Sequence, residues 1–220
     1  ATATASGGKT LLVPTPFAIK MALLDAACRL EGQAIAEEAW AWLGSLTVAL
    51  RPAPVVVVNN TFTKVLKPRR GEARPGSKHA GYFQQTINYR EYAYLAGPFA
   101  IALELNKDAD DERLVRWLAH VNYLGKRGSF IQLQDVPQMV DELPPDFLVV
   151  DGQLQGFNLG AVLTQLDDVG EGLSFSRASI YSGEKIALGK HRVLRHVALP
   201  YRLVASSRGY SHYELVGETP

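Results

Sequence analysis

The feature that most constrains the fold is a polar segment between two stretches rich in β-branched and aromatic side chains. Lys67 to Gly81 reads KPRRGEARPGSKHAG and has almost no apolar side chain, so it cannot contribute to a hydrophobic core. Val55 to Leu66 before it and Tyr82 to Leu95 after it have the composition of strands. We therefore predict a long antiparallel hairpin with a protruding, mobile basic arm at its tip, inserted at about residues 64–90.

The rest of the chain alternates short helical and strand patterns. Thr15 followed by Pro16 predicts a helix over Pro16–Leu30, and a second helix is predicted over Gln33–Leu43. A strand over Phe99–Leu105, a helix beginning at Asp110 and Asp111, several short strands and a final strand near Val197–Ala205 are expected to follow. With 220 residues, 47% of them hydrophobic, the chain can bury one core. We predict a single domain, residues 1–220, of mixed α+β class with mainly antiparallel strands.

Charge is balanced overall but unevenly distributed. The net charge is +1, yet residues 64–103 carry seven positive and two negative groups, and residues 104–151 carry five and ten. Such a pattern can hold a polyanion on one face and a basic partner on another. Ordinary solvated faces are the alternative interpretation.

The sequence lacks the residue patterns of disulfide frameworks, metal sites and phosphate-binding loops. The single cysteine, Cys28, excludes disulfide frameworks and cysteine-based metal clusters, and the five histidines form no pair with a third ligand beside it. The Gly7–Thr10 sequence GGKT is not a phosphate-binding loop, because Ala3 stands where that motif needs glycine. We expect no metal, no cofactor, no membrane partner and a cytoplasmic location.

The hairpin has the composition of a single-stranded RNA site. Cations neutralise phosphates, and aromatic faces stack unpaired bases at roughly 1 to 3 kcal/mol per base. Tyr82, Phe83 and Tyr89 are interleaved with the basic side chains, and a solvated, disordered loop is the alternative. The predicted RNA-binding residues here are Lys64, Lys67, Arg69, Arg70, Arg74, Lys78, His79 and Arg90.

A glycine-flanked turn supplies a second candidate. It follows the third predicted helix and comprises Gly125, Lys126, Arg127, Gly128 and Ser129. Glycines let the backbone approach a phosphate closely, and the amides of a tight turn add to the side-chain charges. The alternative is a helix C-cap whose basic residues complement the helix dipole.

Together these motifs resemble the Cas-five family of the CRISPR-associated RAMP superfamily. The resemblance spans about residues 7–130, from GGKT and the LVPTPFAIK helix start through the basic hairpin to the glycine turn. It implies a ferredoxin-like (RRM-type) antiparallel sheet with helices on one face and a thumb hairpin. It further implies a non-catalytic subunit of a type I Cascade complex that grips the 5′ handle of the CRISPR guide RNA. The implied partners are the backbone and large subunits and, through the complex, target DNA.

The resemblance adds Lys20, on the first helix, as a further RNA contact. In one respect this sequence departs from the family pattern. Family members begin with a core strand ahead of the proline motif, where this sequence has only residues 1–6, so we expect that strand to be missing or replaced by another segment.

Two alternatives remain open. Some family members are metal-independent endoribonucleases that mature the guide RNA, for which His79, Lys78 and Tyr82 form the candidate catalytic cluster. A scaffold without RNA contact is the other alternative, and it leaves the basic arm unexplained.

Overall fold

The computed structural model describes residues 3–4, 7–8, 10–69, 71, 75–76, 81–126, 128–153, 160–179 and 182–216. The chain forms two compact units that interleave along the sequence. The first comprises Ala1–Leu12, Pro54–Gly97 and Leu203–Glu214, and the second comprises Val13–Ala53, Pro98–Arg202 and Leu215–Pro220. The expected α+β class with mainly antiparallel strands is confirmed. That the whole chain is one domain stays a prediction.

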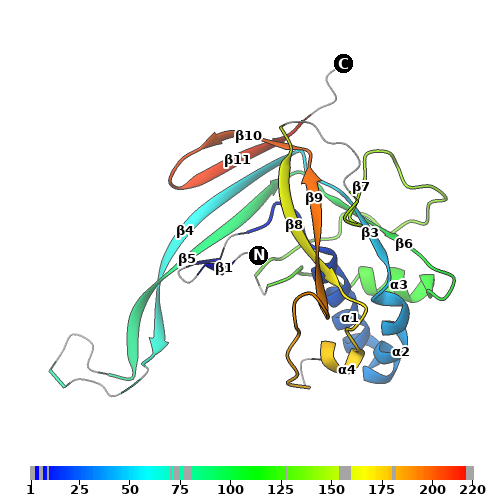
Figure 1. The fold of residues 1–220 in the computed structure, drawn as a ribbon, viewed down its shortest axis with the longest axis horizontal. Helices are drawn as coiled ribbons and strands as arrows, with labels where there is room; N and C mark the ends of the chain where they lie inside the picture. The colour runs from blue at the N-terminus through cyan, green and yellow to red at the C-terminus, as the bar shows by residue number, and fades with distance from the viewer. Residues whose placement is uncertain are drawn as a thin grey trace. The chain divides into compact units, whose positions relative to one another are not determined.

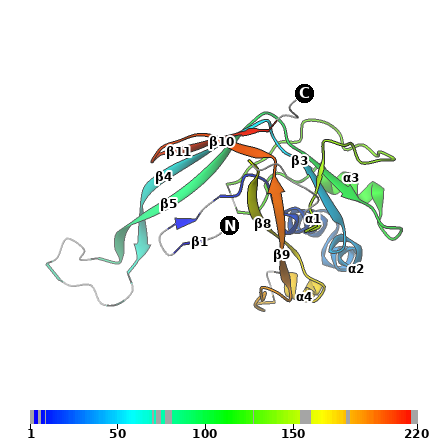
Figure 2. The same ribbon diagram turned by 45° about the horizontal axis from the view of Figure 1, so that its top comes forward.

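A six-stranded sheet dominates the first unit, with the order β1-β2-β5-β4-β11-β10 (Figure 1). Its strands are β1 (Ala3–Thr4), β2 (Gly7–Gly8), β4 (Val55–Pro68), β5 (Phe83–Ala96), β10 (Tyr201–Ser206) and β11 (Tyr210–Leu215). Strand β2 pairs with β5 in parallel. Strands β5, β4 and β11 are antiparallel neighbours (Figure 2).

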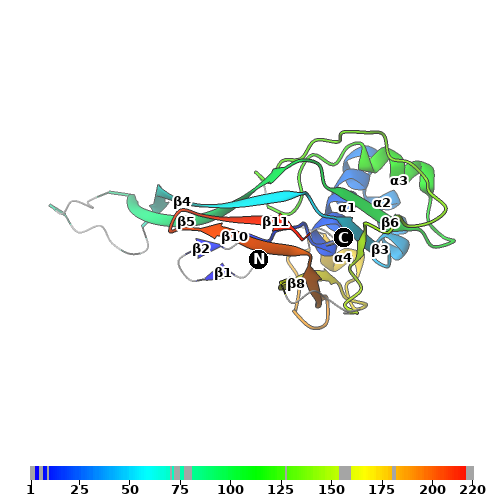
Figure 3. The ribbon, with the colours of Figure 1, turned by 90° about the horizontal axis from the view of Figure 1, so that it is seen from above.

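Strands β4 and β5 form a hairpin that is longer than its neighbours. They pair from Val55↔Ala96 to Pro68↔Phe83, over 14 residues of each strand. Strand β11 pairs with β4 only from Val55 to Asn59, and β2 pairs with β5 only at Tyr89 and Arg90. Beyond the Phe62↔Tyr89 pair the hairpin is therefore a two-stranded arm, which Figure 3 shows from above.

The second unit contains the helices and two small sheets. Helix α1 (Pro16–Glu31) packs against α2 (Gln33–Leu43), α3 (Asp111–Leu118) and β8 (Val162–Val169). One sheet has the order β6-β3-β7, from β6 (Ala100–Glu104), β3 (Thr47–Arg51) and β7 (Leu148–Val149), and the other pairs β8 with β9 (Arg192–Leu199). A short helix, α4 (Phe175–Ala178), follows β8. The Trp42 and Trp117 rings stack in this core with centroids 5.7 Å apart.

Local signals predicted α1, α2 and α3, whereas the short helix α4 was not predicted. Thr15 caps α1 by accepting a hydrogen bond from the Ala18 amide at 3.1 Å, and Asp110 caps α3 by accepting one from the Arg113 amide at 3.0 Å. Strand β4 extends through Lys67 and Pro68, two residues into the segment expected to be an arm. The single final strand over Val197–Ala205 was wrong: β9 ends at Leu199 and β10 begins at Tyr201, because Pro200 has no amide to continue a ladder.

Candidate nucleic-acid interface

The register of β4 and β5 sorts the hairpin side chains onto two faces. Residues directly opposite each other in an antiparallel pair share a face, and successive residues alternate between faces. One face, called the apolar face here, combines exposed apolar side chains from both strands. They are Phe62, Leu66, Phe83, Ile87 and Tyr89. The rings of Phe62 and Tyr89 lie opposite each other with centroids 6.0 Å apart.

The other side, called the tyrosine face, combines tyrosines and polar side chains with valines of β4. Its members on β5 include Arg90, Tyr92 and Tyr94, and its members on β11 are Tyr210, His212 and Glu214. Between these strands, β4 contributes Val55, Val57, Asn59, Thr61, Thr63, Val65 and Lys67. Strand alternation therefore makes the hairpin amphipathic, with different chemistry on its two faces.

The predicted RNA-binding cations of the hairpin are divided between these faces. Lys64 is exposed on the apolar face, whereas Lys67 and Arg90 lie on the tyrosine face. Arg69 helps to close the arm, because its amide donates to the Tyr82 carbonyl at 2.8 Å and its Nε donates to the Gly81 carbonyl at 3.2 Å. The predicted contacts Arg70, Arg74, Lys78 and His79 lie outside the described residues.

The glycine turn is closed by its own backbone. The Leu124 amide donates to the Ser129 carbonyl at 3.1 Å, and the Ser129 amide donates to the Lys126 carbonyl at 3.0 Å. Gly125 and Gly128 have φ of +83° and +98°, which side chains disfavour. Lys126 is exposed, and within the described residues no hydrogen bond uses the amides of Lys126 and Gly128. Those amides and the Lys126 ammonium can therefore meet a phosphate, whereas Arg127 lies outside the described residues.

Lys20 requires a correction. It was expected to contact RNA, but it is only 2% exposed, and its Nζ donates to Asp168 Oδ1 at 2.7 Å and to the Gly44 carbonyl at 3.1 Å. Burial lowers the pKa of Lys20, and the Asp168 carboxylate opposes that shift. The Lys20 ammonium is a buried structural group, which an RNA phosphate cannot reach in this structure.

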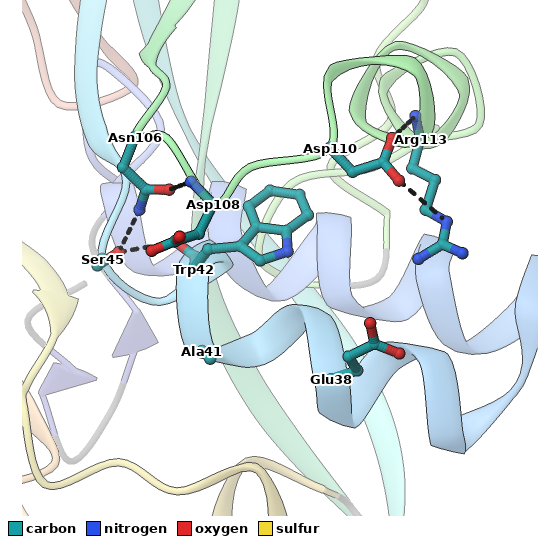
Figure 4. A pocket seen from close by; sticks show the side chains of 8 residues that line it. All are labelled: Glu38, Ala41, Trp42, Ser45, Asn106, Asp108, Asp110 and Arg113. Atoms are coloured by element: carbon teal, nitrogen blue, oxygen red, sulfur yellow. Dashed lines mark hydrogen bonds and ion pairs between the residues drawn. The ribbon is translucent and has the colours of Figure 1, made fainter.

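A cavity of about 470 Å³ in the second unit has the wrong charge for a phosphate. Figure 4 shows its lining from α2, the loop before α3 and the start of that helix. Glu38, Asp108 and Asp110 contribute three carboxylates against one guanidinium, that of Arg113, which lies 3.3 Å from Asp110. Like-charge repulsion makes this cavity a poor site for nucleic acid.

Of the three candidate catalytic residues, the structure describes Tyr82. Tyr82 is 91% exposed, while Lys78 and His79 lie outside the described residues. Burial, reinforced by the charge of Asp25, raises the pKa of the Cys28 thiol, which disfavours the nucleophilic thiolate. Among the described residues, no group of three or more His, Cys, Asp or Glu side chains is placed to hold a metal ion.

No protein-family model and no curated protein matches this chain. Across the described residues, no helix combines the length and the apolar character that crossing a membrane requires.

The tyrosine face was not predicted from the sequence. Tyr82, Phe83 and Tyr89 were singled out because they lie among the cations, but Phe83 and Tyr89 belong to the apolar face. The signal for the other face was the alternation of Arg90, Tyr92 and Tyr94 in the predicted strand, which places three side chains on one side. Tyr210 and His212 could not be assigned to the tyrosine face from the sequence, because that assignment requires knowing that β11 pairs with β4.

Proposed function

We propose that this protein is a non-catalytic RNA-binding subunit of a type I Cascade complex, working in the cytoplasm. Its β4–β5 hairpin serves as the thumb for the 5′ handle of the CRISPR guide RNA, and the Gly125–Ser129 turn is a separate RNA contact of the second unit. The backbone and large subunits are its protein partners, and target DNA reaches it through the assembled complex. The fold belonging to this proposal is the ferredoxin-like (RRM-type) core with a thumb insertion.

The observation that carries the proposal is the two-stranded arm beyond the Phe62↔Tyr89 pair. An arm without further sheet neighbours cannot be explained by packing within that sheet, and it carries the exposed Lys64 and Lys67. Single-stranded nucleic acid requires cations for the phosphates and aromatic faces for the bases, and outside the arm the same hairpin also carries the exposed rings of Tyr92 and Tyr94.

The glycine turn supports the same chemistry from the second unit. It offers unused amides and an exposed lysine, and the adjoining Phe130 is 79% exposed. An exposed aromatic ring beside a phosphate-binding turn can stack on a base of the bound strand.

The test is the salt dependence of RNA binding by the purified chain. Reversing Lys64 and Lys67 to Glu together should weaken binding of a short single-stranded repeat RNA. The log-log slope against salt should fall by about 0.7 for each lost phosphate contact. The matched control is the double variant Lys107→Glu, Lys185→Glu, because both lysines are exposed, lie outside the hairpin and make the same total charge change. Equal slopes in all three proteins would contradict RNA gripping by the hairpin.

A second measurement tests the identity of the RNA. Guide RNA that copurifies with the intact assembly should begin with a uniform short 5′ tag. Heterogeneous cellular RNA would overturn the CRISPR assignment, even if the hairpin binds RNA.

A further inference from the structure

The strand register gathers three exposed tyrosines on the tyrosine face. Tyr92 of β5 and Tyr210 of β11 are both opposite Asn59 of β4, so they flank that residue from the two neighbouring strands. Tyr94 and His212 flank Val57 in the same way. Tyr92 is 55% exposed, Tyr94 is 64% exposed and Tyr210 is 40% exposed. Rings that remain this open on a paired sheet are not being used to build a core.

The spacing of these rings suits nucleic-acid bases. Residues two apart on a strand are about 6.8 Å apart, so Tyr92 and Tyr94 are separated by roughly that distance. This is twice the rise of about 3.4 Å between stacked bases, which leaves room for a base between the two rings. Asn59 is exposed between Tyr92 and Tyr210, and its amide can both donate to and accept from a base edge.

Charge on this face also fits a polyanion. Arg90 lies two residues before Tyr92, and within the described residues no ion pair involves it. Lys67 lies further along the same face and is exposed. Among the described residues of β4, β5 and β11, the carboxylate on this face is that of Glu214, which lies 3.6 Å from the His212 imidazole. The cations therefore lie beyond the tyrosines, on the side away from Glu214.

The apolar face is less suited to bases. Its Phe62 and Tyr89 rings already pack against each other, and Leu66 and Ile87 are aliphatic. Among the described residues, its one other ring, Phe83, lies at the end of the ladder opposite Pro68 and not opposite a second ring. Aliphatic side chains offer no π-face for stacking.

We propose that the tyrosine face is a binding site for the unpaired bases of single-stranded RNA. Tyr92 and Tyr94 stack on bases, Asn59 hydrogen-bonds to a base edge, and Arg90 neutralises a phosphate. This inference rests on the proposed function for its ligand, but it assigns base recognition to one face of the sheet and to residues that the arm does not include.

The test compares stacking with charge. The probes are a fluorescently labelled 12-nucleotide single-stranded RNA, an RNA of equal length with abasic riboses in place of its central nucleotides, and an RNA duplex. Tyr92→Ala and Tyr94→Ala should each weaken binding of the first probe by roughly 5- to 140-fold per lost base stack. The salt slope should not change, because no cation is removed. Tyr92→Phe and Tyr94→Phe keep the aromatic face and should bind like the unmodified protein.

The abasic probe and the duplex should bind more weakly than the first probe and should be insensitive to the alanine changes, since neither presents free bases. The matched control is the double variant Phe62→Ala, Tyr89→Ala, which removes two rings from the apolar face and should keep base-dependent affinity. Melting temperatures of all variants establish that each is folded.

The outcomes separate this inference from the proposed function. If RNA binds with the expected salt slope but the alanine variants of Tyr92 and Tyr94 bind equally well, the tyrosine face is not the base site and the hairpin proposal stands. The same conclusion follows if the phenylalanine variants lose as much affinity as the alanine variants, or if the apolar-face control loses more. If the unmodified protein binds none of the three probes, the proposed function fails and this inference fails with it.

Discussion

Lys20 and Asp168 form an ion pair inside the second unit, with Lys20 Nζ 2.7 Å from Asp168 Oδ1 and both side chains less than 10% exposed. Removing one partner of such a pair leaves a buried charge without its counterion, which costs about 3 to 5 kcal/mol. Lys20→Met should therefore lower the free energy of unfolding by about 3 kcal/mol, the lower end of that range. The reason is that Arg195, 3.4 Å from the other Asp168 oxygen, still offsets part of the carboxylate charge. Urea denaturation measures this loss.

Arg29→Met is the matched control for that change. Arg29 pairs with Asp25 at 2.9 Å on the exposed side of α1, and exposed pairs contribute about 0 to 1 kcal/mol. A Lys20→Met protein of unchanged stability but weakened RNA binding would restore Lys20 as an RNA contact.

Glu31 should make the stability of the second unit depend on acid pH. Burial alone would raise the pKa of Glu31, but hydrogen bonds from Trp117 and Arg116 and the charges of Arg116 and Arg113 lower it below 4.5. The folded state then binds the proton more weakly than the unfolded state. The ionised Glu31 therefore contributes stability above pH 4.5, and that contribution is lost as the pH falls through its lower folded value.

Thermal melting at pH 7 and below pH 4.5 should show this dependence. Glu31→Gln should be less stable at neutral pH and should lose less stability on acidification. Glu37→Gln, an exposed change on α2, should follow the unmodified protein. Parallel curves for Glu31→Gln and the unmodified protein would contradict the assignment.

Gly128 tests whether the glycine turn meets RNA or only follows a helix. A side chain there has open space, with no atom within 4 Å of the added Cβ, but the φ of +98° makes any substitution cost about 1 to 2 kcal/mol. Gly183→Ala is the matched control, because Gly183 has φ of +66° and equally open space. Both variants should lose similar stability, and Gly128→Ala alone should weaken binding of single-stranded RNA. Equal RNA affinity in the two folded variants would mean that the turn has no phosphate to approach.

Helices and the hairpin could be predicted from the sequence because their signals are local. Thr15 and Asp110 cap helices through atoms three residues away, and the β-branched run from Val55 needs no distant partner to be recognised as a strand. Whether a charged side chain is buried, and with which partner, could not be predicted in the same way. The resemblance implied an RNA contact at Lys20, whereas its ion-pair partner in the structure, Asp168, lies 148 residues further along the chain.

The two faces of the hairpin show a similar limit. The sequence shows that side chains alternate between two faces along β5. Which β4 side chains share each of those faces depends on the register of β4 and β5. The contribution of β11 depends on its pairing with β4, between segments about 150 residues apart. A shift of one residue would have placed Tyr92 beside Asn60 rather than Asn59 and moved it onto the face of Phe62 relative to β4. Composition therefore indicated RNA chemistry for the hairpin, while the assignment of that chemistry to particular residues required the register.

The last prediction separates binding from catalysis. Metal-independent cleavage of RNA needs a base near the attacking 2′-hydroxyl, and a positioned histidine contributes about 100-fold to 10,000-fold in rate. Tyr82, the described member of the candidate cluster, is 91% exposed, so packing does not hold its ring in one orientation, as a catalytic group requires. Single-turnover assays of a labelled repeat RNA in EDTA should therefore show binding without specific cleavage. His79→Ala and the control His196→Ala should behave alike. Specific cutting that disappears in His79→Ala and persists in His196→Ala would establish the endoribonuclease alternative and overturn the non-catalytic proposal.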